Sequence, residues 1–166
     1  MIAFKFFRSG RVGPFTGFRW EEGEWVEAGP APRICDSGVH ACRVADLPFW
    51  VNDELWAIEL DGEIVESERK VVAVRGRLVR RADAWDVAAA QRLADSCAAR
   101  ARALADARPE DEMLAMIAGD CERRASQGRA YAATFIAAFA AERAGGPDTR
   151  AAERAAQAAW FADLLR

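Results

Sequence analysis

The sequence has very little lysine and histidine, and it has no run of like charge. Lysine occurs only at Lys5 and Lys70, and His40 is the sole histidine, so arginine supplies nearly all of the positive charge. The formal net charge is −3 at pH 7 and no basic tail is present. These features argue against a sequence-independent grip on nucleic acid phosphates. We therefore expect no nucleic acid partner.

Long apolar segments are also missing. No apolar run approaches the ~20 residues that a membrane helix needs. Residues 1–8 lack the apolar core and the small-residue cleavage site of a signal peptide. We expect no membrane association and a cytoplasmic location. The four cysteines are then expected to be reduced thiols or metal ligands rather than disulfides.

What is present predicts an α+β protein with two different halves. Of the 166 residues, 52% are hydrophobic and 30% are charged, as in an ordinary folded protein. Residues 1–81 are predicted to form a small β-rich domain that contains a Cys/His cluster. Residues 82–166 are predicted to form an alanine-rich bundle or layer of about four helices, packed against it.

Period-two patterns and turn signals place the β structure. We predict strands at residues 2–8, 24–27, 33–35, 54–60 and 70–80. Asp61-Gly62 predicts a tight hairpin turn, because both positions of such a turn favour positive φ. A short helix is predicted at residues 47–51, with Asp46 as its N-cap.

Helical periodicity begins at Asp83. A second helix is predicted to open at Pro109, and a third to end at Gly145-Gly146, with Asp148 or Thr149 capping the last helix. The apolar stripe of the third helix is predicted to be Tyr131, Phe135 and Phe139. Because alanine buries little area, Phe135, Phe139, Trp160 and Leu164 are expected to supply most of the hydrophobic stabilisation, about 1.5–3 kcal/mol each.

The strongest concentration of reactive side chains is Cys35, His40 and Cys42. If Ser37-Gly38 closes a two-residue hairpin, Cys35 lies opposite His40, and strand alternation places Cys42 on the same face. These are donors that zinc prefers, but the spacing is not a standard zinc-finger spacing and no fourth ligand is near. No metal is therefore assigned, and the cofactor, if there is one, is unknown.

Two other interpretations of this cluster stay open. A thiol beside an imidazole can serve as a nucleophile, which makes His40, Cys42 and Cys35 the catalytic candidates. Alternatively, His40 is a half-buried, hydrogen-bonded strand residue beside two packed thiols. Cys97 and Cys121 lie on apolar helical stripes and are explained as small core residues.

Two further segments have the composition of a binding site. The glycine-rich loop at residues 8–20 carries Arg8, Arg11 and Arg19, which suit a phosphate or carboxylate, and Trp20, which suits stacking. The paired carboxylates Glu66 and Glu68 follow a strand and point the same way. A surface loop and solvated charges at a strand end are the alternatives.

The first 81 residues also resemble an uncharacterised bacterial and phage domain family. The resemblance rests on a cysteine followed by Gly38-Val39-His40-Ala41-Cys42 and on the strand Glu68-Arg69-Lys70-Val71-Val72. The alanine-rich remainder is similar to tails found in proteins assigned to immunity. That family has no activity to transfer, so the resemblance implies domain boundaries rather than chemistry.

A second resemblance is to ADP-ribosyltransferases. Phe7-Arg8-Ser9, Gly38-Val39-His40 and Glu66-Ser67-Glu68 occur in that family's order, although its Ser-Thr-Ser element is absent. This resemblance implies an enzyme that uses NAD.

The leading hypothesis is a binding module with a Cys/His/Arg/Trp-lined groove for a small anionic ligand or a protein partner. A small enzyme, with a Cys-His dyad or with NAD, is the alternative, and a metal-binding role is the third.

Overall fold

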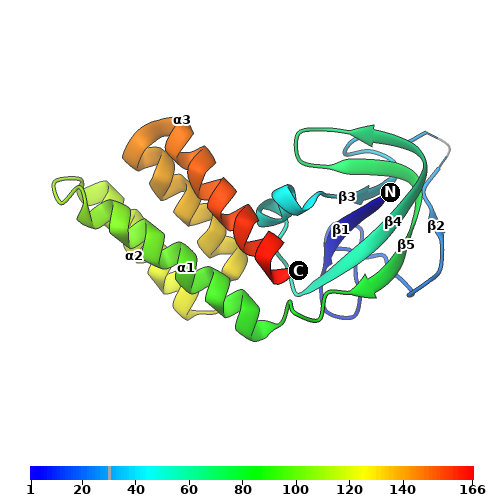
Figure 1. Cartoon of the computed structure of the whole chain (residues 1–166), viewed down its shortest axis with the longest axis horizontal. Coiled ribbons are helices and arrows are strands. Elements are labelled where there is room, and N and C mark those ends of the chain that lie inside the picture. The colour runs from blue at the N-terminus through cyan, green and yellow to red at the C-terminus, as the bar shows by residue number, and fades with distance from the viewer. Residues whose placement is uncertain (30) are drawn as a thin grey trace. The chain divides into compact units, whose positions relative to one another are not determined.

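The structure is a computed structural model that describes residues 1–29 and 31–166. It divides into two compact units, a sheet unit formed by Met1–Trp85 and a helical unit formed by Asp86–Leu164. The β-strands belong to the first unit and the α-helices to the second (Figure 1). The predicted α+β class is confirmed. No helix of the described residues is both long enough and apolar enough to span a lipid bilayer.

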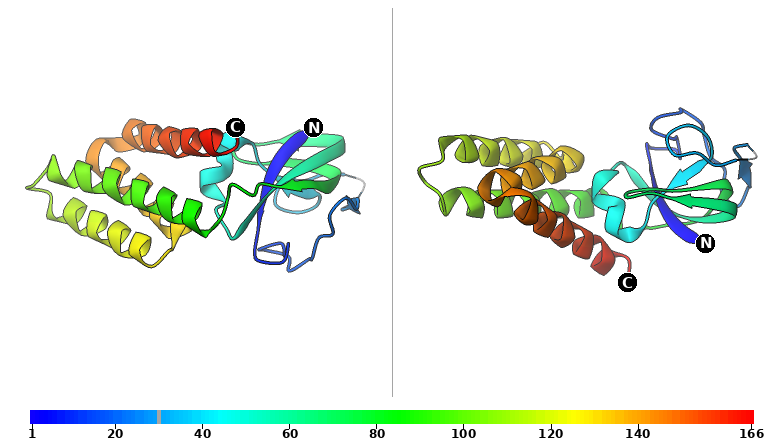
Figure 2. Two further views of the ribbon diagram at one scale, coloured as in Figure 1. Left: turned by 60° about the horizontal axis from the view of Figure 1, so that its bottom comes forward. Right: turned by 90° about the horizontal axis from the view of Figure 1, so that it is seen from above.

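The sheet unit is built from antiparallel pairings. The strand order is β1 (Ile2–Phe7), β4 (Glu54–Glu66), β5 (Val71–Arg81) and β2 (Val26–Glu27), and β3 (Val39–Ala41) also pairs with β5. A bridge between Phe4 and Cys42 joins β1 to the residue that follows β3. The pairings β1–β4, β4–β5, β5–β3 and the bridge back to β1 therefore close a small ring, and Figure 2 shows how β4 and β5 curl.

One face of these strands forms the core of the sheet unit. The core cluster includes Ile58, Leu60, Val71, Ala73 and Leu78, which are almost completely buried. Ala3 and Phe7 of β1 belong to the same cluster. Because side chains alternate along a strand, Lys5 lies on the same inward face as these two residues. The sequence thus directs a charged side chain toward an apolar interior.

The predicted hairpin at Asp61-Gly62 is wrong. Strand β4 continues through both residues, and its pairing with β5 shifts register between Asp61 and Ile64. Gly62 has φ +82°, so the glycine serves a β-bulge rather than a turn. The chain reverses later, where the Ser67 N–H donates to the Lys70 carbonyl at 2.9 Å.

Two smaller predictions in this unit are also corrected. Residues 33–35 do not form a strand but the start of a turn. The helix predicted at residues 47–51 is a 3₁₀-helix, η1 (Val44–Phe49). Asp46 lies inside η1 rather than at its N-cap, and its carboxylate accepts from Arg43 Nε at 2.9 Å.

Acidic caps start the first two helices. Asp86 caps α1 (Val87–Asp106) by accepting from the Ala89 N–H at 2.7 Å. Asp111 caps α2 (Glu112–Ser126) by accepting from the Leu114 N–H at 3.0 Å. These caps satisfy N–H groups that have no partner within their helices. Pro109, predicted to open the second helix, lies in the turn before α2.

The third helix confirms the predicted break. Helix α3 (Ala130–Leu164) has non-helical backbone at Gly145 and Gly146, with φ −151° and +77°. The chain reverses there, so that α3 consists of two helical segments side by side (Figure 1). Glycine permits this reversal because positive φ is open to it without steric cost.

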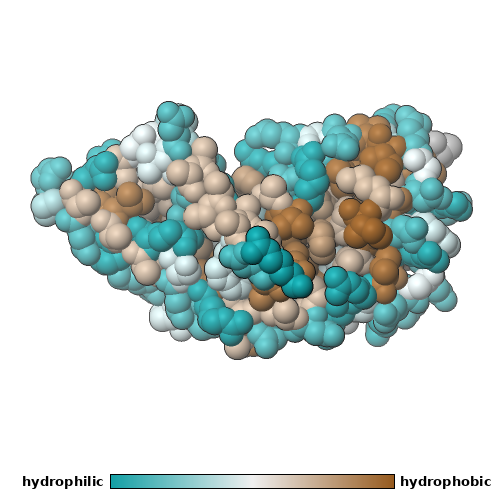
Figure 3. All heavy atoms as spheres, in the orientation of Figure 1, coloured by the Kyte–Doolittle hydropathy of each residue, from teal (hydrophilic) through white to brown (hydrophobic). Residues whose placement is uncertain are grey.

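The predicted aromatic core of α3 is wrong. Tyr131, Phe135 and Phe139 are 50%, 39% and 57% exposed. The buried face of this helix consists mainly of small residues: Ala133, Thr134, Ala137, Ala138, Ala140 and Ala141. Small side chains let neighbouring helices approach closely, so the rings of Tyr131, Phe135 and Phe139 lie outside this part of the core, whereas Phe161 near the end of α3 is fully buried. Brown residues are visible on both units in the space-filling view of Figure 3, so each unit presents some hydrophobic surface.

The helical unit also buries a polar network. Arg100 of α1 donates to both carboxylate oxygens of Glu153 on α3, at 2.7 and 2.8 Å. Gln157 Nε2 donates to Glu153 at 2.7 Å and to the Thr134 carbonyl at 3.0 Å. Arg100, Glu153 and Gln157 thus have partners of complementary character.

Candidate functional site

The turn before β3 has a different position from the one predicted. Arg33 and Ser37 form an antiparallel bridge, with their N–H···O bonds at 2.7 and 3.1 Å, so residues 34–36 make the turn. Gly38 instead passes close to β5: a Cβ there would lie 2.5 Å from Val72 Cγ1. Cys35 sits in the turn with φ +64°, a conformation that is uncommon for residues other than glycine.

In this turn Cys35 contacts the His40 ring with its backbone N–H and not with its thiol. The Cys35 N–H donates to His40 Nε2 at 3.0 Å, and His40 Nδ1 lies 3.0 Å from the Gly38 carbonyl. Nε2 must be unprotonated to accept, so Nδ1 carries the proton and donates it to Gly38. Burial lowers the pKa of His40, and the charges of Lys5 and Lys70 lower it further.

The two sulfur atoms have different surroundings. The Cys42 backbone bonds to Phe4 in both directions at 2.8 Å, and its side chain is buried. Burial, reinforced by the charge of Asp46, raises the pKa of the Cys42 thiol to about 12. Cys35 is exposed, and its Sγ accepts from Lys70 Nζ at 3.3 Å. The three groups do not form one reactive patch as the hairpin at Ser37-Gly38 predicted.

Lys5 is the charged group at the centre of the arrangement. Its Nζ donates to the His40 carbonyl at 2.7 Å and lies 5.6 and 5.9 Å from the ring centroids of Phe7 and Trp20. Desolvation by burial lowers the pKa of Lys5 to about 8, and the charge of Lys70 contributes in the same direction. No carboxylate within the described residues forms an ion pair with either lysine, whereas many of the arginines have such a pair.

Lys70 lies immediately before β5 and reaches the site from there. Its Nζ lies 4.7 Å from the Trp50 ring centroid, in addition to the contact with Cys35. Trp50 is fixed by its Nε1 donating to the Arg69 carbonyl at 3.1 Å. Phe15 meets the Trp50 ring edge-on at 6.4 Å and is 85% exposed. The Trp50 ring therefore contacts both the Lys70 ammonium and the exposed Phe15 ring.

The turn that carries Lys70 is held by a guanidinium. Arg43 donates to the carbonyls of Ser67 and Glu68 at 2.8 and 3.0 Å. The guanidinium of Arg69 stacks over the Phe49 ring at 4.3 Å. These contacts fix the turn between β4 and β5 against η1, and so they position the lysine that follows.

Comparison with known protein families gives a match to the sheet unit. The model of the family described as Domain of unknown function (DUF7666) matches residues 1–90. The chain belongs to this family. The match covers the whole sheet unit and the cluster of Lys5, His40 and Lys70. No curated protein and no solved structure matches the chain.

Sequence reasoning did not select the two lysines of the DUF7666 domain. The signal was available in two forms. Lysine is rare in this chain, and Lys5 is a charged residue between Ala3 and Phe7 on a face that is otherwise apolar. What could not be read from the sequence is the closing of the ring, which brings Lys70 near Lys5.

The loop predicted to bind a ligand is largely self-paired. Arg8 donates to the Pro14 carbonyl at 2.5 Å, and Arg11 and Arg19 approach Glu21 at 2.9 and 3.8 Å. Trp20 was expected to offer a stacking surface in this loop. It is instead 5% exposed and belongs to the hydrophobic core, because the loop folds its ring inward.

The predicted carboxylate pair is not brought to that loop. Glu66 accepts from Arg43 at 3.0 Å, and Glu68 pairs with Arg69 at 3.2 Å. Glu66 ends β4, whereas Arg8 follows the residue of β1 that pairs with Glu54, the first residue of β4. Two of the segments that resemble ADP-ribosyltransferases, Phe7-Arg8-Ser9 and Glu66-Ser67-Glu68, therefore lie at opposite ends of β4.

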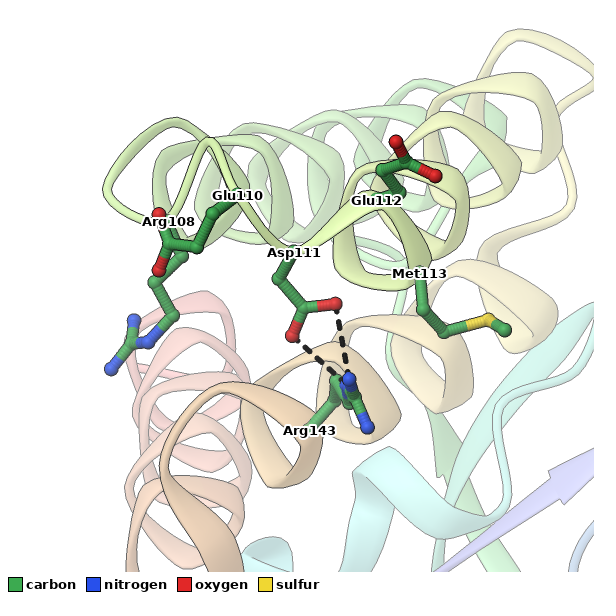
Figure 4. A pocket seen from close by; sticks show the side chains of 6 residues that line it. All are labelled: Arg108, Glu110, Asp111, Glu112, Met113 and Arg143. Carbon is green, nitrogen blue, oxygen red and sulfur yellow. Dashed lines mark hydrogen bonds and ion pairs between the residues drawn. The ribbon is translucent and has the colours of Figure 1, made fainter.

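A shallow hollow on the helical unit has the character of a structural contact. Its volume is about 460 Å³, and Figure 4 shows Asp111 and Arg143 facing each other across it, with Met113 beside them. Arg143 holds the Asp111 carboxylate at 2.9 and 3.2 Å and lowers its pKa. The same carboxylate caps α2. Its charge is therefore already used within the fold.

A metal centre has no support in the geometry. Across residues 1–29 and 31–166 there is no group of three or more histidine, cysteine, aspartate or glutamate side chains that could hold a metal ion.

Proposed function

We propose that the DUF7666 domain of this chain binds a small anionic ligand at the cluster of Lys5, His40 and Lys70. The observation that carries the proposal is that the charge of Lys70 acts on Lys5, while across residues 1–29 and 31–166 neither ammonium forms an ion pair with a carboxylate. Charges buried in proteins are normally paired with an opposite charge. An anion supplied from solution is the partner that this cluster lacks.

The hydrogen-bonding capacity of the site supports this proposal. An ammonium group has three donors. Lys5 uses one on the His40 carbonyl, and Lys70 uses one on the Cys35 sulfur. Donors therefore remain for a carboxylate or phosphate, and the partly buried position strengthens such charge-assisted bonds.

The other hypotheses have less support. For a Cys-His dyad, His40 would have to take a proton from a thiol, but both of its ring nitrogens are engaged with backbone groups. A protein partner remains the alternative occupant of this surface, and the similarity of the helices to tails of immunity proteins belongs with that alternative. A bacterial or phage origin and a cytoplasmic location are parts of the same expectation.

Inorganic phosphate provides the test. We expect phosphate, but not an equal ionic strength of chloride, to raise the melting temperature of the full chain. Lys5→Met and Lys70→Met should each remove most of this response. The control is Arg75→Met, which removes the same charge from β5 where the guanidinium pairs with Asp61. Equal phosphate responses in all four proteins would refute the proposed site.

The pH dependence sharpens this test. An anion favours the charged ammonium, and the pKa of Lys5 without a ligand is about 8. Above that pH the amine must first take up a proton, so the affinity for phosphate should fall as the pH rises through about 8. A constant affinity between pH 7 and 9.5 would show that Lys5 takes no part.

A further inference from the structure

The amine of Lys5 has the surroundings of a nucleophile rather than those of a structural charge. It lies on the inward face of β1, its Nζ is held by the His40 carbonyl at 2.7 Å, and the rings of Phe7 and Trp20 stand within 6 Å. A second ammonium, that of Lys70, acts on it. An apolar wall and a neighbouring cation are the two means by which proteins activate lysine for reaction with carbonyl compounds.

The consequence is a supply of neutral amine at physiological pH. With a pKa of about 8, roughly a tenth of Lys5 is unprotonated at pH 7, compared with about one part in three thousand at the ordinary value. Only the unprotonated amine has the lone pair that attacks carbon. The Nζ position is fixed by its hydrogen bond to the His40 carbonyl.

We propose that Lys5 forms an imine with a small aldehyde or 2-oxo acid whose anionic group is held by Lys70. The inference rests on the proposed anion site and adds the substrate class to it. Lys5 Nζ attacks the carbonyl carbon, and a C–N bond forms while the carbonyl oxygen takes a proton. The carbinolamine then loses water as the C=N bond forms. One amine and one carbonyl give one imine and one water, with no change in oxidation state.

The position of Lys70 determines which carbonyl compounds react best. Its ammonium lies beside Trp50 and Cys35, and a carboxylate or phosphate attached to the carbonyl compound can bind there. A neutral aldehyde lacks this anchor. Anionic aldehydes should therefore modify Lys5 faster than neutral ones of similar size.

The chain contains its own internal control, because Lys5 and Lys70 are its only lysines. The full chain is incubated with glyoxylate, an anionic aldehyde, or with propanal, a neutral one, in the presence of cyanoborohydride, which reduces the imine to a stable amine. Peptide mapping by mass spectrometry then gives the extent of modification at each lysine over a pH series.

We expect Lys5 to be modified at least tenfold faster than Lys70 by glyoxylate, with a half-maximal rate near pH 8. Lys70→Met should slow the glyoxylate reaction at Lys5 more than the propanal reaction, because it removes the anchor for the carboxylate in addition to the cation that lowers the Lys5 pKa. Modification of Lys5 no faster than that of Lys70 in the wild-type chain overturns the inference. This comparison needs no variant, so it does not depend on how a substitution folds.

The two proposals fail in distinguishable ways. If phosphate stabilises the chain through Lys5 and Lys70 but Lys5 resists both aldehydes, the anion site stands and the imine chemistry is refuted. If Lys5 reacts rapidly but equally with glyoxylate and propanal, and phosphate has no effect, the anion site and with it the proposed substrate class are refuted.

Discussion

In the helical unit the guanidinium of Arg100 meets both oxygens of Glu153. In the sheet unit the ammonium of Lys5 meets a carbonyl oxygen and two aromatic rings, and no carboxylate of the described residues pairs with it. Both charges are partly withdrawn from water on folding. Their pKa values record the difference: that of Arg100 is raised, chiefly by its hydrogen bond to Glu153, and that of Lys5 is lowered, chiefly by burial.

This difference separates two roles of buried charge. A cation that is paired with a carboxylate can stabilise the fold, and here the Arg100–Glu153 pair joins α1 to α3. A cation without one destabilises the fold, and such a cost is typical of functional positions. The thiols also differ between the two units. Cys97 and Cys121 are buried between helices, and burial raises the pKa of each to about 12, whereas Cys35 of the sheet unit is exposed. These thiols are core residues, as the sequence predicted.

The largest expected effect comes from breaking the complete pair. Glu153→Ala leaves the partly buried Arg100 without its carboxylate and removes an acceptor from Gln157. We expect a loss of about 3 kcal/mol or more in the free energy of unfolding, measured by urea denaturation. The control is Glu122→Ala, which breaks the surface pair with Arg102 in the same unit and should cost less than about 1 kcal/mol. Equal losses would mean that burial of Glu153 is unimportant.

Removing the unpaired charge of Lys5 should have the opposite effect and increase the free energy of unfolding. Below pH 8 the native state carries a proton on Lys5 against the desolvation cost, and between pH 8 and about 10.5 the unfolded chain holds that proton while the native state has released it. The contribution of Lys5 to stability therefore becomes more favourable as the pH rises through this window. We expect Lys5→Met to stabilise the chain at pH 7 by about 1–3 kcal/mol, part of the gain being offset by the lost bond to His40.

The measurement is the difference in unfolding free energy between the wild-type chain and Lys5→Met from pH 7 to 10.5. It should shrink as the pH rises. The wild-type curve alone is not sufficient, because Cys42, Cys97 and Cys121 have raised pKa values and destabilise the native state above pH 9. The difference between the two proteins cancels that contribution. A variant less stable than the wild-type chain at pH 7 would show that the Lys5 ammonium is well solvated or well paired.

Local signals in the sequence predicted the elements of the fold well. The period-two pattern of residues 70–80 gave β5, and Gly145-Gly146 gave the break in α3. Errors arose where one residue type has two structural uses. Gly62 supplies a positive φ to a bulge rather than to a hairpin turn. Gly38 does not close a two-residue turn; instead, its lack of a side chain lets the backbone pass close to Val72. The choice between such uses is made by strand pairing, which is not local.

The site was predicted only in part, because strand pairing also determines which of its residues come together. The approach of Cys35 to His40 follows from a short segment and was anticipated, although the contact is made by an amide and not by a thiol. Lys5 and Lys70 are far apart in the chain and meet only because β1, β3 and β5 share one ring. No spacing rule applies to groups that are joined by the closing of a sheet.

The helical unit contains the clearest failure of a size argument, and it gives the smallest expected effect. Phe135 and Phe139 were predicted to form much of its core, but that part of α3 packs mainly through alanine and Phe139 is 57% exposed. Phe139→Ser should therefore change the free energy of unfolding by less than about 0.5 kcal/mol. Leu114→Ala, at a fully buried position of α2, should cost about 2–5 kcal/mol in the same urea assay. If Phe139→Ser instead destabilised the chain as much as Leu114→Ala, the Phe139 ring would have to be covered in solution. The exposed residues Tyr131, Phe135 and Phe139 would then form an interface with another surface.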